Sequence, residues 1–122
     1  MRTILVVDDE KSILVFLEKL LTKHGYNVLV AGDGLEGFEL MSSHAGVIDL
    51  LLTDVQMPEL DGFGLAKAVA EARPETKIVF ITGHPGEYHE RLADKTVVPK
   101  PFDSRRLLDV IRAELEAEAP RQ

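Results

Sequence analysis

The feature that most restricts the fold of this chain is an apolar run that ends abruptly on an acid, Leu50-Leu51-Leu52-Thr53-Asp54. A short continuous apolar run is typical of a strand buried on both faces, as in a parallel sheet covered by helices. Asp54 then lies at the carboxyl end of that strand, where open α/β sheets bind their ligands. A second apolar run, residues 4–7, ends in the same way on Asp8 and Asp9. We therefore expect two buried strands that bring three carboxylates to one edge of a sheet.

Composition excludes several classes of protein. The 122 residues point to one domain, and a hydrophobic content of 45% allows it to bury a core. The absence of cysteine excludes disulfides and thiolate metal sites and is compatible with the cytoplasm, the location we expect. A formal net charge of −7 argues against direct nucleic-acid binding. No apolar run approaches the roughly 18 residues of a membrane span, and the first residues do not resemble a signal peptide.

Hydrophobic periodicity predicts five strands that alternate with five helices. The strands are expected at residues 4–7, 26–31, 48–53, 77–81 and 96–98. The helices are expected at about residues 11–24, 34–43, around 65–69, within 83–94 and from 104 onward, the fourth shortened by Pro85 and Gly86. This alternation predicts a doubly wound, flavodoxin-like α/β domain whose five-stranded parallel sheet has the strand order 2-1-3-4-5. We expect the domain to span residues 1–118 and residues 119–122 to form a polar C-terminal tail.

Individual side chains carry further expectations. Asp9 and Glu10 are expected in the first turn of the first helix, where acidic groups interact favourably with the helix dipole. Gly25 is expected to end that helix, and Asp103 or Ser104 to cap the last one. The phenylalanines are assigned to packing: Phe38, Phe63 and Phe80 in the core, and Phe102 between the last helix and the sheet.

Polar residues at the strand ends predict a phosphate and metal site. In the order 2-1-3-4-5 the first and third strands are neighbours, so Asp8, Asp9 and Asp54 lie side by side. Such close carboxylates raise one another's pKa unless a cation joins them, and Mg²⁺ suits a few carboxylates together with a phosphate oxygen. Thr82 and Lys100 follow the fourth and fifth strands, and their side chains can contact phosphoryl oxygens. Asp54 is then a candidate nucleophile. Taken one at a time, each of these residues is more simply explained as a helix cap, a turn former or a solvated side chain. Their position together at the carboxyl ends of neighbouring strands is what indicates the site.

Four segments carry a specific resemblance to a known family. They are ILVVDDE at 4–10, TDVQMP at 53–58 followed by Asp61-Gly62, ITG at 81–83 and KPF at 100–102. Together they resemble the receiver domain of two-component response regulators, and the match spans nearly the whole chain. The resemblance implies that Asp54 accepts phosphate from a histidine kinase or a histidine phosphotransfer protein. It also implies an output through an unidentified protein, an intrinsic autophosphorylation and autodephosphorylation activity without substrate turnover, and a monomer or weak dimer.

The resemblance further assigns roles to the residues around Asp54. Asp9 would be the chief acidic Mg²⁺ ligand, Asp8 would assist through water, and Gln56 would contribute its backbone carbonyl. Thr82 and Lys100 would contact the phosphoryl group. The peptide bond between Lys100 and the following proline would be cis, a form that is accessible because the second residue is proline.

Two features depart from the family pattern. Receivers usually carry Tyr or Phe three residues before the lysine, but this chain has Val97, a β-branched residue without a ring to move. The interval from Thr82 to Lys100 is also a few residues short, which resembles receivers attached to hybrid sensor kinases. Two hypotheses follow: phosphorylation alters binding to a partner, or the domain binds its partner constitutively and phosphorylation is uncoupled from that binding.

Other interpretations have less support. An aspartate-nucleophile phosphatase of the haloacid dehalogenase type needs a second Asp two positions after the nucleophile, where this chain has Gln56. Residues 32–37, GDGLEG, match the dinucleotide fingerprint G-x-G-x-x-G, but they follow the second strand, an edge strand, and not the first. His84 is expected near the site, as a solvated loop residue or as one that modulates the lifetime of the phosphate.

Overall fold

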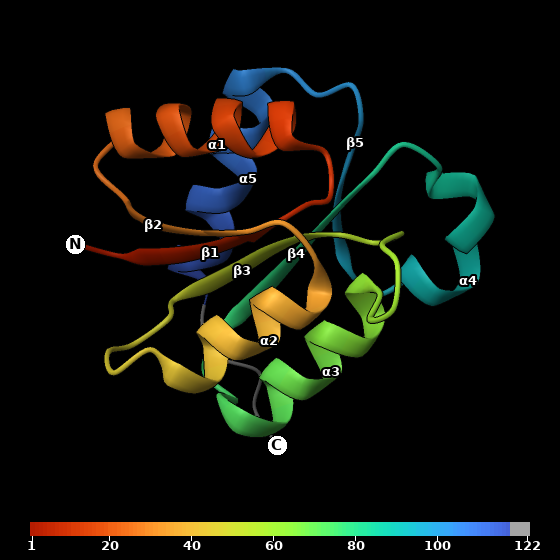
Figure 1. Ribbon diagram of the computed structural model, residues 1–122. Coiled ribbons are helices and arrows are strands. Elements are labelled where there is room, and N and C mark those ends of the chain that lie inside the picture. Colours follow the sequence, from red (N-terminus) through yellow and green to blue (C-terminus); the bar gives the residue numbers. More distant parts are fainter. Residues whose placement is uncertain (118–122) are drawn as a thin grey trace.

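The computed structural model describes residues 1–117 (Figure 1), so the expected tail at residues 119–122 lies outside the described residues. The strands are β1 (Thr3–Val7), β2 (Asn27–Ala31), β3 (Leu50–Asp54), β4 (Lys77–Thr82) and β5 (Thr96–Pro99). The helices are α1 (Lys11–Lys23), α2 (Gly34–Ser43), α3 (Gly62–Ala72), α4 (His89–Leu92) and α5 (Ser104–Glu116), with the 3₁₀ helix η1 (Pro85–Tyr88) before α4. All strand pairs are parallel in the order β2-β1-β3-β4-β5, which confirms the predicted fold class. No helix within the described residues is both long and apolar enough to span a bilayer.

The sheet has a helical layer on each face, with α1 and α5 on one and α2 and α3 on the other (Figure 1). Side chains of each strand alternate between the two layers because the period of a strand is two. Ile4 and Leu50 pack toward α1 and α5, whereas Leu5 and Leu51 pack toward α2 and α3. Every residue of β1 and β3 is buried, as the continuous apolar runs predicted. Neither β1 nor β3 therefore has a face that is exposed to solvent.

Helix boundaries agree with most of the predicted signals. Gly25, with φ of +91°, follows the C-cap of α1 and ends that helix as expected. Asp103 caps α5, since its carboxylate accepts the Arg105 N–H at 3.0 Å. The expectation for Asp9 and Glu10 was wrong, because α1 begins at Lys11 and both acids precede its first turn. They belong to the loop that leaves β1.

The phenylalanine assignments were correct in part. Phe80 is buried and Phe63 packs against it, with ring centroids 5.3 Å apart. Phe38 is not a core residue: 42% of it is exposed, because the buried stripe of α2 runs through Gly34, Gly37 and Met41. Phe102 is half-buried and packs against the core between the sheet and the α1–α5 layer, but its ring faces Phe16 of α1, with centroids 6.0 Å apart.

The fourth helix is short, as Pro85 and Gly86 predicted. Four residues of η1 lead into the four residues of α4, and α4 packs mainly against η1. Figure 1 shows this segment set off beside the β4–β5 end of the sheet.

At the opposite end, β2 is an edge strand, and the glycine-rich turn after it opens α2 with Asp33 as its N-cap. The dinucleotide fingerprint is therefore away from the switch point and serves as a helix-opening turn.

Candidate functional site

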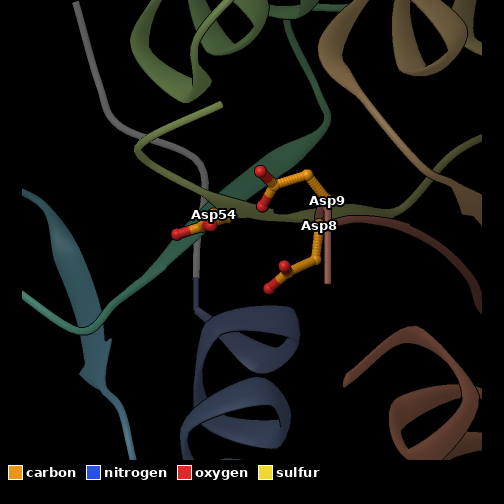
Figure 2. Close-up of side chains that lie close together, drawn as sticks. All are labelled: Asp8, Asp9 and Asp54. Atoms are coloured by element: carbon orange, nitrogen blue, oxygen red, sulfur yellow. The ribbon is translucent and has the colours of Figure 1, made fainter. Parts of the chain in front are cut away.

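Three aspartates meet at the carboxyl edge of the sheet. Asp54 is the last residue of β3, while Asp8 and Asp9 follow β1, and the two strands are paired with Val7 opposite Thr53. Carboxylate oxygens of the three residues all lie within 4.8 Å of one another. Figure 2 shows the three side chains gathered at the ends of the two strands. The strand order thus brings together the three acids that the sequence placed at one edge.

The three carboxylates differ in burial and in hydrogen bonding. Asp8 is fully buried and Asp54 is 6% exposed, whereas Asp9 is open to solvent. Asp54 Oδ1 accepts the Val55 N–H at 2.9 Å, and Asp8 Oδ1 accepts the Glu10 N–H at 2.8 Å. Asp8 Oδ2 is buried and accepts no hydrogen bond from the backbone or from a neutral side chain within residues 1–117. A buried carboxylate oxygen left in this way calls for positive charge.

Lys100 supplies that charge. Its Nζ lies 2.9 Å from Asp8 Oδ2, 3.5 Å from Asp54 Oδ2 and 3.3 Å from Glu10 Oε1. The side chain is only 13% exposed, and the peptide bond to Pro101 is cis, as the family resemblance implied. The contact with Glu10 was missed, because from sequence alone Glu10 was assigned to the helix dipole. The signal available was its place directly after the two aspartates.

Thr82 is held beside the acids by the end of β4. Ile81 pairs with Asp54, so the next residue, Thr82, lies just beyond the acid on the neighbouring strand. Its residue exposure is 1%, and its Oγ1 accepts the His84 N–H at 3.0 Å. The Thr82 carbonyl accepts the Lys100 N–H at 2.7 Å. One backbone hydrogen bond therefore fixes the threonine and the lysine relative to each other.

Burial and mutual repulsion change the acidity of this cluster. Desolvation, followed by the charge of Asp8, raises the pKa of Asp54 from 3.8 to about 6. Desolvation likewise raises the pKa of Asp8, against the opposing effect of Lys100. Burial alone would lower the pKa of Lys100, but its contacts with Asp8 and Asp54 outweigh burial and raise it. The lysine is therefore firmly charged, while Asp54 is a carboxylate that protonates readily below neutral pH.

A glycine allows the chain to pass directly behind Asp54. Gly62, the first residue of α3, donates its N–H to the Val55 carbonyl at 2.8 Å. A Cβ atom at this position would overlap the backbone carbonyl oxygen of Asp54. Asp61 caps the same helix by accepting the Gly64 N–H at 2.9 Å. The start of α3 therefore packs against the backbone of Asp54.

An open cavity of about 550 Å³ lies over the cluster. Its lining combines the predicted site residues with loop residues: Asp9, Glu10, Asp54, Gln56, Met57, Pro58, Thr82, Gly83, His84 and Lys100. His84 is thus at the site, as expected, and is exposed. Asp8 is fully buried and does not line the cavity. Met57, Pro58 and Gly83 were not singled out as lining residues, because a loop path cannot be read from strand periodicity.

The cluster suits a hard divalent cation. It offers three carboxylates whose oxygens lie within 4.8 Å of one another, and Mg²⁺ prefers oxygen ligands of this kind. Exposed Asp9 leaves room for water on the cavity side. Gln56 lines the same cavity, and its backbone carbonyl as a ligand stays a prediction. The donor set therefore fits Mg²⁺.

A doubly wound parallel sheet that bears acids, a lysine and a threonine at its carboxyl edge defines a phosphoacceptor class of α/β domain. The model of the response regulator receiver domain matches residues 4–112, and the chain belongs to this family. The receiver domain is the phosphoacceptor signalling unit of two-component systems. The resemblance inferred from the four sequence segments is thereby confirmed.

Relatives include proteins of different organisation. The response regulator receiver protein CpdR of Brucella abortus (strain 2308) is 37% identical, over 96% of this chain and 99% of that protein. The sensor kinase CckA of the same strain is 31% identical over 93% of this chain. A crystal structure of the receiver domain from the hybrid histidine kinase CckA is 34% identical, with a TM-score of 0.81, over 93% of this chain and 99% of that one. The chain spans only 12% of the CckA kinase and 49% of the first transcriptional regulator it matches.

Proposed function

We propose that Asp54 accepts a phosphoryl group from the phosphohistidine of a histidine kinase or of a histidine phosphotransfer protein. A carboxylate oxygen of Asp54 attacks phosphorus, the P–N bond to the imidazole breaks, and its electron pair stays on the imidazole nitrogen. The product is an acyl phosphate on Asp54. The observation that carries the proposal is that Asp54 lines an open cavity while Lys100 Nζ lies 3.5 Å from its Oδ2.

The surrounding residues each have a part in this transfer. Lys100 neutralises a phosphoryl oxygen, and the Thr82 hydroxyl donates a hydrogen bond to another. Asp8, Asp9, Asp54 and the Gln56 backbone carbonyl would hold Mg²⁺, which when bound would add positive charge where phosphoryl oxygens gather. Lys100 and the ion together offset the repulsion between an anionic donor and an anionic cluster.

The acyl phosphate is also the route back to the free domain. Water attacks phosphorus, the P–O bond to Asp54 breaks, and the carboxylate is regenerated with release of inorganic phosphate. We infer a signalling domain whose self-phosphorylation and self-dephosphorylation serve a cycle, and not an enzyme that turns over a substrate. We also place its action in the cytoplasm, acting on proteins and not on nucleic acid or membrane, as a monomer or weak dimer.

Phosphorylation replaces the single negative charge of the Asp54 carboxylate with a phosphoryl group of about −1.5 to −2 charges. Lys100 is at present shared among three carboxylates, and Glu10 is the most exposed of these partners. A phosphoryl group draws Lys100 away from Glu10, which frees the loop before α1. Partner affinity then changes with phosphorylation.

Incubation with Mg²⁺ and acetyl phosphate, followed by intact-protein mass spectrometry, tests the proposal. We expect one phosphate adduct that requires Mg²⁺ and is absent from Asp54→Asn. Asp109→Asn, an exposed acid on α5, is the matched control and should keep the adduct. An adduct on the Asp54→Asn protein, or none on the wild type, would overturn the assignment.

A second candidate function is a constitutive partner-binding domain with phosphorylation uncoupled from output. Val97 motivates it, because this β5 residue is half-buried next to Phe80 without a ring that could move, and α4 is short. Partner affinity measured with and without the phosphate adduct separates the two. Equal affinities, unchanged by Asp54→Asn, favour the constitutive domain.

A further inference from the structure

An apolar groove lies between α3 and the β4–β5 end of the sheet, away from the acidic site. Its volume is about 340 Å³. The floor is formed by Phe80 and Ile78 of β4, and the wall by Phe63, Ala66 and Ala70 of α3. Of these residues Phe63 and Ile78 are half-buried and Ala70 is exposed, whereas Phe80 and Ala66 are buried. A concave site of a few hundred Å³ with a largely apolar lining and a few polar groups is typical of a binding pocket.

The short η1–α4 segment contacts the groove at Phe63. The ring of Tyr88 meets that of Phe63 edge-on, with centroids 5.7 Å apart, and the Arg91 guanidinium lies 3.7 Å from the Phe63 centroid. These contacts hold η1 and α4 at one end of the groove. Figure 1 shows α4 set off beside the sheet.

Positive charge surrounds this apolar groove. Lys67 of α3 and Lys95, just before β5, are part of its lining, and Arg91 lies over the Phe63 ring at its end. Within residues 1–117, Lys67 and Arg91 make no salt bridge, and Lys95 has only an exposed contact of 3.7 Å with Asp94. Such an exposed pair contributes little and is readily exchanged. In a chain of net charge −7, three cations around one apolar groove favour an acidic ligand.

We propose that this groove binds an amphipathic helical segment of a partner protein. Aliphatic side chains at helical spacing pack on Phe63, Ala70 and Ile78. Flanking Asp or Glu side chains pair with Lys67 and Lys95. Helix-in-groove binding suits a site walled by α3, because a docked helix can run alongside it. The groove does not include Asp54 or any other residue of the acidic site. The inference therefore goes beyond phosphotransfer and stands without it.

A titration with two designed peptides tests the proposal. Both are 15-residue helices with Leu at positions i, i+3, i+4 and i+7, and they differ only in having Glu or Lys at the flanking positions. Amide chemical shifts of the ¹⁵N-labelled full chain are followed by NMR. We expect the Leu/Glu peptide to shift Ala66, Ala70 and Ile78 and to bind at least tenfold more tightly than the Leu/Lys peptide.

Matched variants locate the site. Ala70→Glu places bulk and negative charge in the groove and should weaken binding of the Leu/Glu peptide at least tenfold. Ala72→Glu makes the same change on the same helix outside the groove and should leave binding unchanged. Lys67→Glu combined with Lys95→Glu should reverse the preference between the peptides, whereas Lys19→Glu on α1 should not.

Three outcomes would overturn the inference. They are shifts that map to another face, equal affinity for the two peptides, and self-association through the groove without peptide, which would make a second copy the occupant. Spectra of the variants away from the groove report whether each one is folded. Repeating the titration with Asp54→Asn, which should bind as the wild type does, keeps a failure here distinct from a failure of the phosphotransfer proposal.

Discussion

Gly62 lies so close to the backbone carbonyl of Asp54 that no side chain fits between them. The contact joins the start of α3 to the end of β3, and a hydrogen bond of 2.8 Å from the Gly62 N–H to the Val55 carbonyl holds it. The start of α3 therefore holds the backbone of Asp54, which we assign as the phosphoacceptor, while its carboxylate faces the cavity. Rigid backbone support of this kind keeps a reacting group in place.

Gly62→Ala should be destabilising, because the new Cβ must displace the Asp54 backbone. Overpacking against a fixed backbone costs about 1–3 kcal/mol, and we expect the free energy of unfolding in urea to fall by about that amount. Gly32→Ala is the matched control, since its Cβ would have no atom within 4 Å, and its free energy should change by less than about 1 kcal/mol. Equal behaviour of the two variants would contradict the close contact.

Asp54→Asn should stabilise the metal-free domain at neutral pH. The folded-state pKa of Asp54 is raised from 3.8 to about 6, so the stabilisation gained by protonating it is fully present below pH 3.8 and is lost as the pH rises through about 6. Above that range the wild type carries a destabilising charge that the variant lacks, worth up to about 3 kcal/mol. We expect the variant to be more stable at pH 7.5 without Mg²⁺, with the difference shrinking between pH 6 and 4. Exposed Asp94→Asn, the control, should change the free energy of unfolding at pH 7.5 by less than about 0.5 kcal/mol.

Mg²⁺ should stabilise the wild type through the aspartate cluster. Ion at ten times its dissociation constant adds about 1.4 kcal/mol, which for a domain of this size raises Tm by roughly 4–8 °C. Asp9→Asn removes an exposed ligand without disturbing the core, so its Tm should rise by less than about 1 °C. Differential scanning fluorimetry with Mg²⁺ and with excess chelator measures the shift. A full response from the Asp9→Asn protein would place the ion elsewhere.

Arg73→Met should destabilise the fold far from the site. The Arg73 guanidinium donates to the carbonyls of Met41, His44 and Gly46 at distances of 2.7–3.0 Å, and so caps the end of α2 from the end of α3. Losing a charged donor from several partly buried carbonyls should cost about 2 kcal/mol in the free energy of unfolding. Arg106→Met, on the exposed face of α5, should change it by less than about 0.5 kcal/mol.

The elements of the fold and the acids of the site could be predicted because each depends on short stretches of sequence. The continuous apolar runs before Asp8 and Asp54 identify strands buried on both faces, and helical periods between them leave a doubly wound sheet as the simplest arrangement. That order alone places the carboxyl ends of β1 and β3 together. Pro85 and Gly86 likewise predicted the short fourth helix from local backbone restrictions.

Only the tertiary structure decided which side chains meet across elements. Phe38 is a large apolar residue of the kind that usually lies in a core, but 42% of it is exposed. The orientation of α2 on the sheet buries Gly34 and Met41 instead. Glu10 turns to Lys100, 90 positions away in sequence, because the ends of β1 and β5 share one edge of the sheet. Local patterns report a residue's period and turn preference, whereas contacts of this kind depend on how whole elements pack. The sequence by itself therefore determined the sheet and the acids at its edge. Packing decided the support behind Asp54, the sharing of Lys100 and the open groove beside α3.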